Sequence, residues 1–168
     1  MKNKRIPVFA IIIVTALFLL LFNTIHSNHS TLSDRIISYY ENSENAQNIP
    51  NESFELNISD FTDFEWEYVM IYRNPTTEKE ISEAGGIDYE GDTDLTSGMI
   101  FINDNKVVYE EVFETDFESP DKFVIYPHQD INADSKINKF ANDNAVFIGK
   151  VIEYNGDKKY QFYPKTDK

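Results

Sequence analysis

The chain has 168 residues, with 29 Asp plus Glu, 15 Lys plus Arg and no cysteine. A formal net charge of −14 repels phosphates, so nucleic acid is not an expected partner, and the lack of cysteine excludes disulfides, thiolate metal sites and cysteine nucleophiles. The length allows one domain of ordinary size, and 13 Phe and 10 Tyr supply the apolar area for its core.

An uncharged apolar run, Ile6 to Phe22, follows the basic residues Lys2, Lys4 and Arg5. Such a run favours insertion into a lipid bilayer, and the basic flank holds the N-terminus in the cytoplasm. The sequence therefore predicts a cytoplasmic segment, 1–5, and a transmembrane anchor, 6–25. The rest of the chain is expected outside the cell membrane, in a single-pass topology.

Cleavage of the apolar run as a signal peptide is the alternative. The nearest candidate cut falls at Ser27 and places the branched residue Ile25 two positions before it, where a small residue is needed. We therefore favour the uncleaved anchor over a secreted protein.

The next segment, 26–50, is predicted to be a juxtamembrane helical stalk. Thr31 and Asp34 form a variant of the capping box that begins a helix. Its apolar residues fall on one face at helical spacing: Leu32, Ile36, Ile37 and Tyr40. The polar stretch that ends at Pro50 sets the expected boundary with an acidic extracytoplasmic α+β domain, 51–168.

The domain should begin with strands. Residues Phe54 to Ile58 alternate between apolar and polar, and so do Phe64 to Tyr72. In the second strand the core face would hold Phe64, Trp66, Tyr68, Met70 and Tyr72. A capping box at Thr77 predicts a short helix that ends at Gly85-Gly86, with Ile81 and Ala84 facing the sheet.

Two hairpins are expected further on. One joins Gly98–Ile102 to Val107–Phe113, and the other joins Val146–Tyr154 to Lys159–Tyr163 through Asn155-Gly156. Between them, Lys122–Tyr126 is a predicted strand and Ser135–Phe140 one or two helical turns. The fold class is thus α+β: a mainly antiparallel sheet with one solvated face and two or three short helices, preceded by the transmembrane helix.

A calcium loop is the leading candidate for a metal site. Asp130, Asn132 and Asp134 stand at its first, third and fifth positions and Asn138 at its ninth, as in the loops of EF-hand and dockerin modules, which the segment resembles. Ser135 replaces the glycine of the sharp turn, and Ala141 replaces the closing carboxylate. An Asx-rich turn that caps a helix is therefore the favoured interpretation, and calcium the alternative.

No constellation for nucleophilic catalysis is expected. The chain has no cysteine and no G-x-S-x-G, and His128 is the single histidine of the predicted domain. An envelope hydrolase that uses paired carboxylates stays open, because 29 acids always contain close pairs.

The order from Phe61 to Gly86, an aromatic strand, then Pro75-Thr76-Thr77, then a short helix, resembles segments of uncharacterised membrane-anchored or secreted proteins of Gram-positive bacteria. The resemblance implies no activity and no cofactor. The leading hypothesis is a non-enzymatic binding or accessory module at the cell envelope, whose acidic domain meets an envelope protein or another cationic partner. The alternatives are the hydrolase and a calcium-dependent adhesion or sensing module.

Overall fold

The computed structural model describes residues 30–42, 53–91, 93–114, 121–130 and 133–165. Residues Thr31–Lys168 form one compact unit. The predicted anchor, 6–25, lies outside the described residues. Among the helices of the described residues, none is both long and apolar enough to cross a bilayer.

Eight strands form two four-stranded sheets. Sheet A has the order β1 (Phe54–Asn57), β7 (Val146–Tyr154), β8 (Asp157–Pro164) and β5 (Phe123–Ile125). Sheet B has the order β4 (Lys106–Glu114), β3 (Thr96–Asn103), β2 (Tyr68–Tyr72) and β6 (Ile137–Ala141). Every pair is antiparallel except β5 with β8, so the prediction of a mainly antiparallel α+β fold is confirmed, although with two sheets instead of one.

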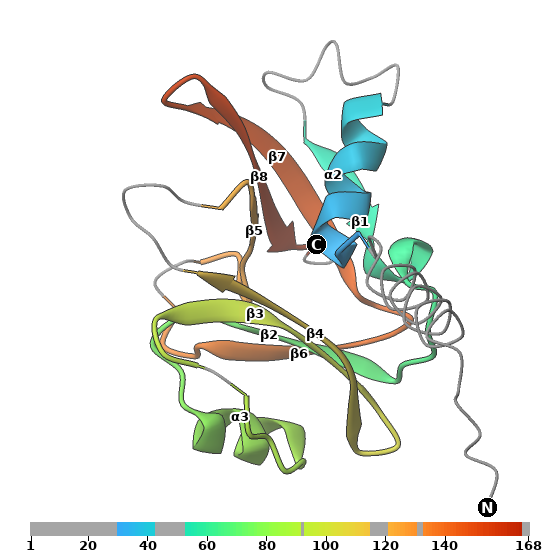
Figure 1. Cartoon of the computed structure of the whole chain (residues 1–168), viewed down its shortest axis with the longest axis vertical. Coiled ribbons are helices and arrows are strands. Elements are labelled where there is room, and N and C mark those ends of the chain that lie inside the picture. The colour runs from blue at the N-terminus through green and yellow to red at the C-terminus, as the bar shows by residue number, and fades with distance from the viewer. Residues whose placement is uncertain (1–29, 43–52, 92, 115–120, 131–132, 166–168) are drawn as a thin grey trace, which may run out of the picture. The chain divides into compact units, whose positions relative to one another are not determined.

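The main core lies between the two sheets, whose strands run crosswise in Figure 1. Sheet B contributes Val69, Ile71, Met99 and Phe101. Sheet A contributes Leu56, Phe147, Tyr160 and Phe162. All eight are buried, and edge-to-face rings such as Phe101 with Trp66, at 5.1 Å between centroids, add to the apolar contact.

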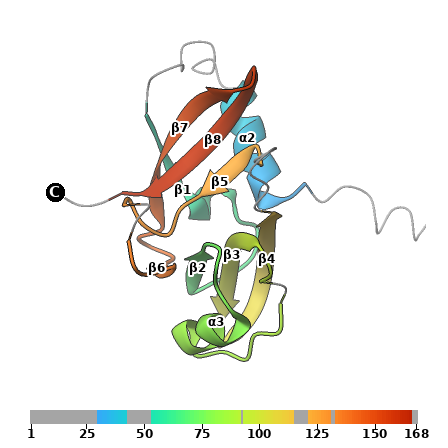
Figure 2. The same ribbon diagram turned by 90° about the vertical axis from the view of Figure 1, so that its left-hand side faces the viewer.

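A smaller core fills the other face of sheet B, where helix α3 (Glu78–Gly85) lies on the side away from sheet A (Figure 2). Met70 and Tyr72 of β2 pack there with Ile81 of α3. Strand β2 is therefore buried on both faces. The predicted single core face from Phe64 to Tyr72 is wrong, because Phe64 and Trp66 precede the strand and pack in the main core instead.

Helix α2 (Leu32–Asn42) is part of the domain's core. Leu32 and Ile36 are fully buried there, and the Tyr40 hydroxyl donates a hydrogen bond of 2.7 Å to the backbone oxygen of Glu55 in β1. The sequence placed this helix in a stalk ahead of a domain that starts at residue 51. The compact unit starts at Thr31 instead, since the apolar face of the helix finds its partner in the two sheets.

Both predicted hairpins are present. Asp104 and Asn105 join β3 to β4, and Asn155 and Gly156 join β7 to β8, each with two consecutive positive φ angles between 50° and 87°. That conformation matches the twist of paired strands and suits Asn, Asp and Gly.

The predicted helical turns at Ser135–Phe140 are wrong, because Ile137–Ala141 forms strand β6 and pairs with β2. Ile137 packs on the α3 side and Phe140 on the main core, as alternation in a strand requires. The partner strand is more than sixty positions away, so local sequence carried no sign of it.

The capping box of α3 is confirmed: Thr77 and Glu80 exchange hydrogen bonds of 3.2 and 2.8 Å, and Gly86 ends the helix at a φ of 68°. Ile81 faces the sheet as predicted, but Ala84 is exposed. Gly85 is buried in its place, where a β-carbon would come within 2.9 Å of the Met70 side chain. The missing side chain lets the last turn approach the sheet.

Candidate functional site

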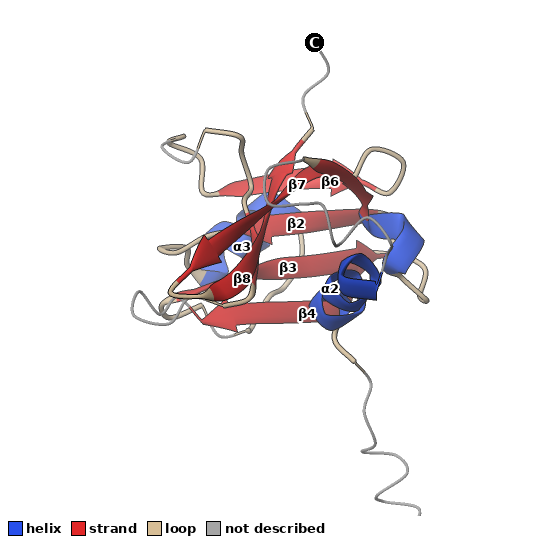
Figure 3. Ribbon diagram, turned by 90° about the horizontal axis from the view of Figure 1, so that it is seen from above, coloured by secondary structure: helices blue, strands red, loops and turns tan. Residues whose placement is uncertain are grey.

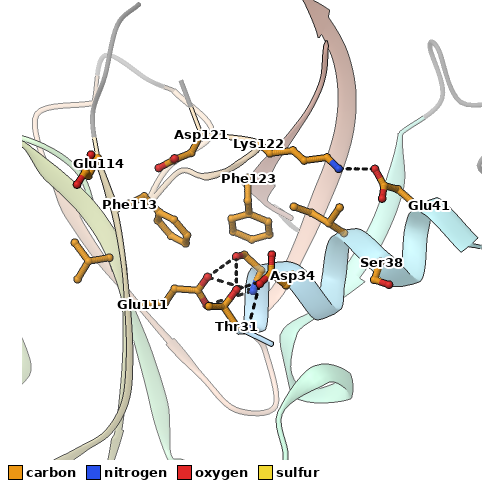
Figure 4. A pocket seen from close by; sticks show the side chains of 13 residues that line it. Thr31, Asp34, Ser38, Glu41, Glu111, Phe113, Glu114, Asp121, Lys122 and Phe123 are labelled. Atoms are coloured by element: carbon orange, nitrogen blue, oxygen red, sulfur yellow. Dashed lines mark hydrogen bonds and ion pairs between the residues drawn. The ribbon is translucent and has the colours of Figure 1, made fainter. Parts of the chain in front are cut away.

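The candidate site is an open pocket of about 560 Å³ between α2, the second half of β4 and Asp121–Phe123, which leads into β5 (Figure 4). The pocket thus draws on both sheets and on the helix beside them. Figure 3 shows that α2 lies next to β4, which forms the margin of its sheet.

Glu111 holds the N-terminus of α2 against β4 on one side of the pocket. Its buried carboxylate accepts hydrogen bonds from the Ser33 backbone N–H, at 3.2 Å, from the Ser33 hydroxyl and from the Tyr109 hydroxyl, at 2.9 Å. Helix N-termini leave N–H groups without intrahelical partners and favour negative charge. Glu111 therefore acts as a structural cap supplied from a distant strand.

Tyr109 continues this network. Its hydroxyl accepts a hydrogen bond of 3.0 Å from the Leu32 backbone N–H. Burial raises the pKa of Tyr109 to about 12; the Leu32 N–H opposes this rise and the neighbouring Glu111 carboxylate adds to it. The tyrosine stays neutral at physiological pH and holds the first turn of α2 in place.

The pocket has an apolar floor. The rings of Phe113 and Phe123 lie 5.4 Å apart between centroids, and the buried Ile37 of α2 lines the same space. Both rings belong to the main core, so the floor is fixed by packing on the side away from the pocket.

The rim of the pocket is acidic. Lys122 and Glu41 form an ion pair of 2.6 Å that joins the residue before β5 to α2. Glu114 is exposed on the β4 side of the pocket, where Asp121 also lies (Figure 4). One lysine and five carboxylates line the pocket in all, a formal net charge of −4: Lys122, Asp34, Glu41, Glu111, Glu114 and Asp121. This arrangement suits a partner that is apolar in its middle and positively charged at its margins.

The predicted calcium ligands are only partly described. Asn132 lies outside the described residues. Asp130 and Asp134 belong to a loop that Arg73 holds by a hydrogen bond of 2.5 Å from its guanidinium to the Ala133 backbone oxygen. Asp134 also lines a smaller pocket of about 300 Å³ beside Glu80 and Lys136, which pair at 3.5 Å.

Asn138, the predicted ninth-position ligand, lies in β6, and its amide donates to the Pro127 backbone oxygen at 3.1 Å. Among the described residues no group of three His, Cys, Asp or Glu side chains could hold a metal ion. The calcium hypothesis stays a prediction. A calcium ion that binds only the folded chain raises the melting midpoint, so melts with calcium and with a chelator test it.

His128 follows Pro127 in the loop after β5. Its Nε2 is buried and has no hydrogen-bond partner in the described part of the chain.

The pocket residues themselves were not predicted, because they come from three separate segments and share no motif. The signal in the sequence was the acidic composition, which indicates a cationic partner without locating it.

Compared with family models, with curated proteins and with solved structures, the chain gives no match.

Proposed function

We propose that the chain is a single-pass protein of the cell membrane whose domain is a non-enzymatic binding module outside the membrane. In this proposal the pocket between α2, β4 and β5 holds a positively charged segment of another envelope protein. The apolar run Ile6 to Phe22 with its basic flank supports the topology.

The observation that carries the binding proposal is the combination of charge and shape in the pocket. A formal charge of −4 surrounds an apolar floor that contains Phe113 and Phe123. Carboxylates at the rim attract a basic segment and repel acidic ones, while burial of apolar side chains on the floor supplies affinity. The volume of about 560 Å³ is in the usual range of ligand pockets, roughly 300–1,000 Å³.

Binding is tested with the full chain in a non-ionic detergent and a fluorescein-labelled nine-residue peptide that alternates lysine and valine. We expect saturable binding, measured by fluorescence anisotropy, that weakens as salt screens the rim charges. The double variant Glu114→Gln, Asp121→Asn should weaken binding by about two- to thirtyfold, because each exposed or half-buried charge contributes about 0.2–1 kcal/mol.

The matched control is Glu78→Gln, Asp88→Asn. It makes the same change in net charge at exposed positions near α3, on the other side of sheet B. If both double variants bind the peptide equally well, or if the unaltered chain does not bind it at low salt, the pocket is not the site and the proposal fails.

The topology is tested separately. Protease added to intact protoplasts should digest the domain, since everything after the anchor is proposed to lie outside. A protected domain contradicts that topology, and a mature chain recovered from the medium and starting beyond Ser27 indicates secretion instead.

A further inference from the structure

The pocket lies against the edge of β4 and not over one of its faces. Four consecutive residues of this strand, Glu111–Glu114, line it, and no residue of the neighbouring strand β3 does. Side chains alternate between the two faces of a sheet, so a pocket over one face meets only every second residue. Contact with four in a row places the pocket beside the strand.

That edge is open. β4 is the last strand of sheet B, and among the described residues no strand pairs with its outer side. On an edge strand of an antiparallel sheet, every second residue directs its N–H and C=O away from the sheet, where they can pair with an added strand. Val112, in the middle of the segment beside the pocket, is 40% exposed.

The first half of β4 differs from the second. The register with β3 shifts at Phe101/Ile102, so Val108 has no partner residue on β3. Such a bulge increases local twist and protects an edge from pairing. From Tyr109 to Glu114 the register is regular, and this is the half that borders the pocket.

We propose that the basic segment binds as an added β-strand along Glu110–Glu114 of β4. This inference rests on the proposed function, and adds the backbone conformation and the side-chain pattern of the partner. The five residues span about 13–17 Å in extended form, at roughly 3.3 Å each.

The two faces of the added strand would meet different chemistry. On the inner face, Phe113 belongs to the main core and Phe123 lies against it, so apolar side chains fit there. On the outer face, Glu114 is exposed and Glu110 accepts a hydrogen bond from the Tyr89 hydroxyl, so lysine or arginine fits there. The partner segment therefore alternates basic and apolar residues.

A second copy of the chain is a poorer occupant of this edge. Two antiparallel copies of Glu110–Glu114 centred on Val112 would set Glu110 of each opposite Glu114 of the other. Like charges directly opposite each other destabilise a strand pair. Charge complementarity thus favours a basic segment from a different protein.

The test separates backbone pairing from charge. Two versions of the lysine–valine peptide are compared with the parent by anisotropy on the full chain in detergent: one N-methylated at every lysine, the other at every valine. N-methylation removes a donor without changing charge. In an added strand only one of the two sets faces β4, so we expect one version to lose about tenfold or more in affinity, and the other to bind about as well as the parent.

Equal binding of both methylated peptides overturns strand addition and leaves the proposed function standing. If the parent peptide binds without dependence on Glu114 and Asp121, or does not bind, both proposals fall. Sedimentation of the unaltered chain tests the remaining alternative, pairing of two copies through this edge. If the chain dimerises, Val112→Lys should be compared with Ile152→Lys on β7. Loss of the dimer in Val112→Lys alone would show that the edge is a self-association surface and that the inference is wrong.

Discussion

The carboxylate of Glu111 caps helix α2 by accepting a hydrogen bond from the backbone N–H of Ser33, 78 positions earlier in the chain. The contact fixes the helix to the edge strand of sheet B and sets one side of the pocket. The side chain of Glu111 therefore has two places in the structure: it lines the candidate site, and it helps to hold α2, which forms another side of that site.

Replacing Glu111 should therefore cost stability. Glu111→Ala leaves the Ser33 N–H and the Tyr109 hydroxyl without their acceptor, so we expect the free energy of unfolding to fall by about 1–3 kcal/mol. Glu111→Gln keeps an acceptor oxygen but loses the charge at the helix N-terminus, a smaller loss of about 1 kcal/mol. Urea unfolding of the full chain in detergent measures both through the fluorescence of Trp66, the single tryptophan, which is buried.

The matched control for Glu111 is Glu114→Ala, on the same strand but exposed, which should change the free energy of unfolding by less than about 0.5 kcal/mol. A loss for Glu111→Ala no larger than that of the control would show that the carboxylate does not hold the helix.

The place of α2 in the core gives a second prediction. Ile36 is fully buried among residues of the main core, so Ile36→Ala should lower the free energy of unfolding of the domain by about 2–5 kcal/mol. Ser38→Ala, on the exposed side of the same helix, is the control and should have little effect. If the helix were a stalk outside the domain, the two variants would unfold at the same urea concentration.

Local signals predicted local structure well in this chain. The capping boxes at Thr31 and Thr77 and the turn at Asn155-Gly156 depend on residues within a few positions of each other, and all three are present. What failed depended on distant partners. Strand β6 needs β2 to pair with, and α2 needs both sheets to cover its apolar face.

The candidate site could not be predicted from sequence for the same reason. Glu111 and Ser33 meet only after sheet B and α2 have packed, and no sequence motif links the two. Lys122 and Glu41 are 81 positions apart. Composition predicts only the sign of the charge of the proposed partner, and the position of the candidate site depends on long-range contacts.

The pairing of β3 with β4 depends on Gly98, which gives a third prediction. A β-carbon at this position would lie 2.6 Å from the Glu111 backbone oxygen and 2.8 Å from the Tyr72 ring. Gly98→Ala should therefore destabilise the domain by about 1–3 kcal/mol, since the opposing backbone must move. Gly98→Ala should also weaken binding of the lysine–valine peptide, because the substitution displaces β4, the proposed binding edge.

The control for Gly98→Ala is Ser97→Ala, at the neighbouring position of β3, because this substitution adds no atom that could meet the opposing strand. Both variants are measured by urea unfolding and by peptide anisotropy. A Gly98→Ala chain as stable as the Ser97→Ala chain contradicts the close approach of the two strands.

Alkaline pH should unfold the domain through tyrosines that are buried or half-buried. Burial is the largest cause that raises the pKa of Tyr40, Tyr109 and Tyr163 to about 12, above the ordinary value of 10.0. Between these values the unfolded chain has lost protons that the folded chain keeps, so the folded state is progressively disfavoured. Stability is fully present below about pH 10 and is lost as the pH rises through about 12.

The tyrosinate ultraviolet absorbance of the full chain in detergent, titrated with and without urea, measures this difference. We expect a later and steeper rise without urea, because the buried hydroxyls ionise as the domain unfolds. Tyr109→Phe removes one of these groups and should reduce the alkaline loss of stability, whereas Tyr154→Phe, 41% exposed on the β7–β8 hairpin, should not. Superimposable titrations in buffer and in urea would show that these tyrosines are not held neutral by the fold.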